Sequence, residues 1–117
     1  MNTAYLDKED FQQYNISIRL SHLAAHLTQI QSLTNNKALE NEVISFMRQS
    51  LHFIEWTVPE LVEVDIDRAA ELVDLGRTIA QWQHSWNKTY KSAKSRSEIA
   101  DIAGKLSKRV REISALA

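Results

Sequence analysis

The sequence predicts an all-α protein, arranged as an antiparallel up-down-up-down four-helix bundle. Its 117 residues include two glycines and one proline, far fewer turn-forming residues than a β-sheet protein of this length needs. Apolar residues recur three and four positions apart along most of the chain, which is the spacing of one helix face. Hydrophobic residues make up 44% of the sequence, enough for one core, so we expect a single domain over residues 1–117.

The first helix is expected over residues 7–33. Asp7 suits its start, because the carboxylate can accept hydrogen bonds from free backbone amides. Asn35 and Asn36 supply a break after it, since asparagine tolerates the left-handed conformation and also caps a following helix. The apolar stripe of this helix consists of Ile16, Leu20, Leu23, Leu27 and Ile30.

The second helix is expected over residues 37–57. Val58 and Pro59 should end it, because the residue before a proline avoids the helical conformation. Phe53 and Trp56 point away from its main apolar stripe, which consists of Val43, Phe46, Met47, Leu51 and Ile54.

The third helix, expected over residues 65–90, carries two adjacent apolar stripes. One contains Gly76, and a glycine inside a helix predicts the close approach of another helix. This stripe of mainly small residues consists of Ala69, Val73, Gly76 and Ala80. The other, bulkier stripe consists of Leu72, Leu75, Ile79, Trp82 and Trp86.

The fourth helix is expected over residues 96–116. The polar segment 92–97 has no apolar periodicity and is interpreted as a loop, and Ser95-Arg96-Ser97-Glu98 fits a capping box at the start of the helix. Its narrow apolar stripe consists of Ile99, Ile102, Leu106, Val110 and Ile113.

Composition excludes several classes of function. Without cysteine, the chain has no disulfide, no thiolate metal site and no thiol catalysis. No apolar run approaches the ~20 residues that span a bilayer, and the first ten residues lack the pattern of a signal peptide. We therefore expect a cytoplasmic protein without membrane contact.

Catalytic, metal and cofactor sites are not predicted. His22 and His26 are four residues apart on one helix face, but the other apolar stripes offer no inward carboxylate to complete a metal site. Arg77 and His84 are seven apart on one face, which leaves a small helical ribonuclease as a third alternative. Arg19 and His26 repeat that spacing, so the pattern has little specificity. We expect no enzyme and no cofactor.

The favoured function is protein–protein interaction or regulation, with self-association as a homodimer or binding to another protein. The two stripes on residues 65–90 span more than half of the helix circumference, so two neighbouring helices cannot easily cover both. Exposed contiguous aromatic surface usually marks an interface. The predicted interface consists of Leu75, Ile79, Trp82 and Trp86.

The alternative function is nucleic-acid binding through the loop after the third helix and through the fourth helix. Residues 1–76 contain 5 basic and 12 acidic residues, a balance of −7, whereas residues 77–117 contain 9 basic and 3 acidic residues, a balance of +6. Cations on a loop can contact phosphates, and an aromatic ring can stack on an unpaired base. Internal charge complementarity explains the same asymmetry. The residues of the possible contact are Lys88, Tyr90, Lys91, Lys94 and Arg96.

Overall fold

The computed structural model describes residues 6–116, and every regular element in that range is helical. The interpretation of the first ten residues falls partly on residues 1–5, which lie outside the described range. In chain order the elements are α1 (Lys8–Gln12), α2 (Ile16–Leu33), the 3₁₀ helix η1 (Lys37–Leu39), α3 (Glu40–Val64), α4 (Ile66–Thr89) and α5 (Ala93–Leu116).

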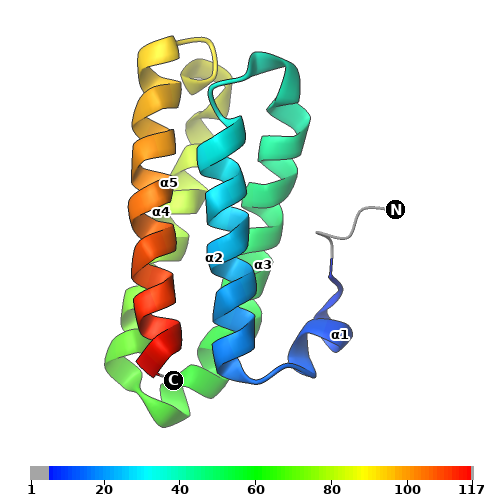
Figure 1. Cartoon of the computed structure of the whole chain (residues 1–117), viewed down its shortest axis with the longest axis vertical. Helices are drawn as coiled ribbons and strands as arrows, with labels where there is room; N and C mark the ends of the chain where they lie inside the picture. Colours follow the sequence, from blue (N-terminus) through cyan, green and yellow to red (C-terminus); the bar gives the residue numbers. More distant parts are fainter. Residues whose placement is uncertain (1–5, 117) are drawn as a thin grey trace.

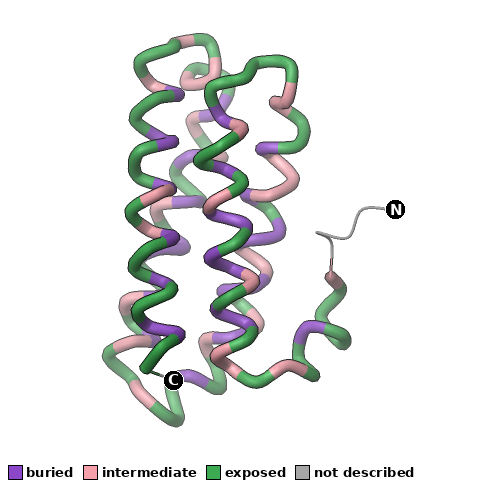
Figure 2. Tube along the Cα trace, in the orientation of Figure 1, coloured by how far each residue is buried: buried purple, intermediate pink, exposed green. Residues whose placement is uncertain are grey.

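The four long helices α2–α5 lie side by side and form the helical body, while the short α1 lies outside it (Figure 1). Helix α2 packs closely along α3 and α5, and α3 packs along α4, whereas few residues of α4 and α5 come close to each other. Buried residues recur along the sides of the helices that face one another, and exposed residues cover the outer sides (Figure 2). No described helix has the length and hydropathy needed to cross a membrane.

The α2–α5 contact is built from small side chains. The Ser107 hydroxyl donates to the backbone oxygen of Ala24 at 2.8 Å and lies 2.8 Å from the Thr28 hydroxyl. In the last turn of α5, the Ser114 hydroxyl donates to the backbone oxygen of Ser17 at 2.8 Å. Small residues let two helix backbones approach closely, and these bonds satisfy the hydroxyls that the approach buries.

The expected first helix is two helices, so the described chain has five α-helices rather than four. Asn15 adopts an extended conformation, and its side chain accepts a hydrogen bond from the amide of Ile18. That geometry makes Asn15 the N-cap of a new helix and separates α1 from α2.

Both ends of the expected second helix are wrong. Residues 37–39 form the 3₁₀ helix η1, so α3 begins at Glu40, and α3 continues through Pro59 to Val64. Pro59 has no amide hydrogen to donate to the Glu55 carbonyl four residues earlier. Both residues are exposed, so water can take the place of the missing donor. Beyond the proline, Leu61 is only 2% exposed, and its burial holds the last turns against the core.

The helix expected over residues 96–116 begins three residues earlier, at Ala93. The Ser92 hydroxyl accepts a hydrogen bond from the amide of Ser95 and so provides the cap that the sequence pattern assigned to Ser95. The expected loop over residues 92–97 is therefore reduced to a short turn.

Candidate interaction surfaces

The predicted interface on α4 is buried inside the helical body. Leu75, Ile79, Trp82 and Trp86 are 5%, 0%, 7% and 5% exposed, and all four belong to the main hydrophobic core. The indole nitrogen of Trp86 donates to Glu40 Oε2 on α3 at 3.0 Å. The expectation that this stripe is exposed is wrong, because the bulky side chains fill the space between the four helices.

The smaller stripe of α4 borders an open apolar groove of about 450 Å³ along α3. Val73 remains 38% exposed there, and Gly76 lies against Ile54 of α3. Charged residues enter the lining at Glu55 on α3 and Arg77 on α4. We call this surface the α3–α4 groove; its apolar lining is Leu51, Ile54, Val58, Pro59, Val73, Gly76 and Ala80.

The basic turn between α4 and α5 retains only part of its predicted contact set. Arg96 is 9% exposed and donates to the backbone oxygen of Tyr90, so it closes the end of α4 instead of facing solvent. The Tyr90 ring stacks on Trp86, with centroids 6.1 Å apart. Lys88, Lys91 and Lys94 are exposed and remain able to meet an anion.

Part of the charge asymmetry is resolved inside the molecule. Arg109 of α5 forms a two-point ion pair with Glu71 of α4, one of its bonds being 2.8 Å from Nη2 to Oε1. Hydrogen bonding to Arg109 lowers the pKa of Glu71, and burial opposes this effect. A basic residue of the back half therefore neutralises an acidic residue of the front half.

The two histidines of α2 contact aromatic rings. The His22 ring lies 5.1 Å from the ring of Tyr14, and the His26 ring lies 4.7 Å from Phe53. The Nδ1 atom of His26 donates to the backbone oxygen of His22 at 3.1 Å. Within residues 6–116 no group of three or more metal-ligating side chains comes together.

Arg77 and His84 are both exposed on α4. The Arg77 guanidinium donates to Asp74 at 3.0 Å, one turn earlier on the same helix. This pairing places Arg77 in a surface ion pair beside the α3–α4 groove.

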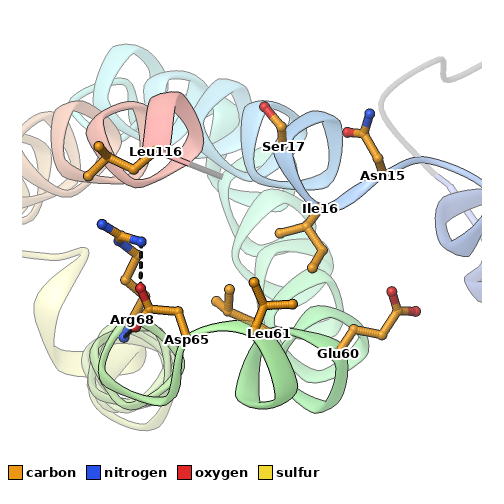
Figure 3. Close-up of a pocket in the computed structure, with 9 residues that line it drawn as sticks. Asn15, Ile16, Ser17, Glu60, Leu61, Asp65, Arg68 and Leu116 are labelled. Carbon is orange, nitrogen blue, oxygen red and sulfur yellow. Dashed lines mark hydrogen bonds and ion pairs between the residues drawn. The ribbon is translucent and has the colours of Figure 1, made fainter.

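A pocket of about 480 Å³ lies at one end of the helical body, among the starts of α2 and α4 and the ends of α3 and α5 (Figure 3). Its polar residues are occupied in holding helix ends. Asp65 accepts from the backbone and side chain of Arg68, Asn15 caps α2, and Ser17 donates to the Ser114 carbonyl. The pocket is therefore a junction of helix ends.

Residues 6–14, which we call the strap, cover a third apolar surface that the sequence did not reveal. Phe11 is fully buried and stacks on Phe53 of α3, with ring centroids 4.2 Å apart. The ring centroid of Trp56 lies 5.7 Å from that of Phe11. The one signal in the sequence was that Phe53 and Trp56 point away from the main stripe of their helix.

Comparison with models of protein families, with curated proteins and with solved structures finds no match to this chain.

Proposed function

We propose that this chain is a non-enzymatic interaction or regulatory protein that self-associates through the α3–α4 groove. Its four long helices would form an antiparallel up-down-up-down scaffold for that surface. The observation that carries the proposal is the groove itself, an open apolar surface on which Val73 is 38% exposed. Contiguous apolar surface on a small protein commonly serves as a contact site.

The charges beside the groove favour a second copy of this chain as the occupant. The Glu55 side chain on α3 is 74% exposed, and the Arg77 side chain on α4 is 78% exposed. A two-fold axis parallel to the helices brings α3 of one copy against α4 of the other. Each Glu55 then faces the partner's Arg77, so one self-complementary surface provides both an apolar centre and paired charges.

Light scattering over a micromolar concentration series tests the proposal. We expect the wild-type mass to approach that of a dimer. The variant Val73→Glu should weaken association at least about tenfold, because it places a carboxylate in an apolar contact. It should leave the monomer folded, since residue 73 is exposed.

A charge reversal identifies the surface more sharply. Glu55→Arg should weaken the dimer by bringing like charges together, and adding Arg77→Glu should restore it. Asp101→Arg, a reversal at an exposed position on α5, serves as the matched control and should leave the mass unchanged. A wild-type mass of one chain throughout the series, or equal masses for all variants, contradicts the proposal.

Nucleic-acid binding is the second candidate function. It is supported by Lys88, Lys91 and Lys94, which are exposed around one turn. It is weakened by the internal roles of Tyr90 and Arg96. Such binding would fall steeply with added salt, because phosphate contacts release counterions.

A further inference from the structure

We infer that the surface of α2 and α3 beneath the strap is a peptide-binding groove, which the strap occupies in cis. Its ligand in trans is a peptide with the same two anchors, an apolar residue followed five positions later by an aromatic residue. This surface is distinct from the α3–α4 groove, and the inference does not depend on self-association.

The first anchor is recognised through its main chain. The side-chain oxygen of Gln49 accepts from the amide of Leu6 at 3.0 Å, and its nitrogen donates to the Leu6 carbonyl at 3.2 Å. Gln49 is 3% exposed, so this amide is built into the wall of α3. A side-chain amide that pairs with both polar groups of one residue fixes the path of the peptide backbone there, and the Leu6 side chain packs partly buried against the core, which selects an apolar residue.

The second anchor is recognised by its ring. Phe11 fills a socket formed by Phe53, Trp56 and His22, with ring centroids 4.2, 5.7 and 6.4 Å away. Between and beyond the anchors the strap faces solvent, at Asp7, Lys8, Glu9, Asp10, Gln12 and Gln13. Specificity therefore resides in two positions, the pattern expected of a short peptide motif.

Arg19 gives a competing peptide something that the strap does not use. Its side chain is 3% exposed and donates to the carbonyls of Gln12 and Tyr14, each at 2.8 Å, and to Glu60 at 3.1 Å. Its Nη1 atom is buried and has no hydrogen-bond partner among the described residues. A ligand with an additional carbonyl or carboxylate after its aromatic residue would satisfy this donor, whose unpaired burial is costly.

The strap is held by few contacts compared with the long helices. Ordering it costs backbone entropy along its whole length, and that cost is offset by the two anchors, the bonds to Arg19 and the contact of Tyr14 with His22. Segments of this kind open locally at a lower free energy than global unfolding. Opening of the strap exposes the peptide-binding surface of α2 and α3, while the four long helices stay packed.

The test measures binding of a fluorescein-labelled peptide, with the sequence of residues 6–15, to the full-length protein. In the wild type the strap competes at high effective concentration, so binding should be weak. Phe11→Ala loosens the strap and should raise peptide affinity at least about tenfold, because the competing closed state loses its main anchor. Adding Gln49→Ala, or replacing the phenylalanine of the peptide by alanine, should abolish the gain.

Three results would overturn the inference. One is a folded Phe11→Ala variant that binds the peptide no better than the wild type. Another is a Phe11→Ala variant that has the mass of a dimer in light scattering and keeps that mass when the peptide is added. That result would assign the surface beneath the strap to another copy of the chain. The third is hydrogen exchange in the wild type as slow in the strap as in α2 and α3. The hydrogen-exchange measurement needs no variant. If Phe11→Ala fails to fold, Leu6→Gly takes its place in the peptide-binding test.

Discussion

Gly76→Ala should stabilise the protein, although Gly76 is buried between two helices. A Cβ atom built at Gly76 would lie 3.5 and 3.6 Å from two side-chain atoms of Ile54 and 4.0 Å from Leu51, which are ordinary contact distances. Removing a glycine from a helix interior contributes about 1 kcal/mol, and burying the new methyl adds up to ~0.8 kcal/mol. We expect a net gain of about 1–1.5 kcal/mol, or a rise of about 3–6 °C in Tm at this chain length.

Chemical denaturation followed by circular dichroism, at one fixed protein concentration, measures this gain. Unchanged or reduced stability would refute the reasoning, because it would mean that α3 and α4 require a closer approach than the structure contains. Gly104→Ala is the matched control. There the new Cβ would lie 2.5 Å from Gln31 Nε2, so the side chain of Gln31 must move, and the gain should be smaller. In a Gln31→Ala background, Gly104→Ala should give the full gain in stability, and a double-mutant cycle measures this coupling.

Three further predictions test other parts of the structure. Trp82→Glu should cost at least about 3 kcal/mol or prevent folding, measured by denaturation, because it buries an unpaired charge in the core. Glu71→Gln should destabilise at neutral pH. Since Arg109 lowers the folded-state pKa of Glu71, the contribution is present above the unfolded pKa and is lost as the pH falls through the folded pKa. The difference in unfolding free energy between wild type and Glu71→Gln should therefore begin to shrink below the ordinary glutamate pKa of about 4.3, and it should close as the pH falls through the lower folded-state pKa. Lys91→Glu with Lys94→Glu should abolish any salt-sensitive binding to single-stranded nucleic acid in an anisotropy titration, and unchanged binding would dissociate the α4–α5 turn from that function.

The sequence predicted the helical class and most of the buried stripes, but not every helix boundary. Apolar spacing is a property of neighbouring residues, and α2 and the bulky stripe of α4 follow it closely, whereas on α5 the expected stripe residue Ile102 is 39% exposed. The boundary errors at Asn15 and Ser92 are local, because each of these side chains forms a cap at a position where the pattern placed none. The error at Pro59 has a tertiary cause, the burial of Leu61 beyond the proline. Local propensity does not contain that information.

The candidate surfaces were less predictable than the fold. The sequence correctly indicated that α4 is apolar over two stripes, yet it could not tell which one faces the interior. The bulky stripe with Trp82 and Trp86 fills the core, and the small stripe with Val73 is left at the α3–α4 groove. The strap was hidden for a different reason. Covering Phe53 with Phe11 is a contact between distant parts of the chain, which no local pattern records.

Helix α3 separates the two proposed binding surfaces. At 3.6 residues per turn, Gln49, Phe53 and Trp56 fall on one side of this helix, and Ile54 and Val58 fall on the opposite side. The contacts agree, since the first three meet the strap and the last two line the α3–α4 groove. A second copy bound at the α3–α4 groove would therefore leave the strap uncovered, and opening of the strap would leave the α3–α4 groove unchanged. The two proposals can therefore fail independently, and only a change in the packing of α3 itself would couple them.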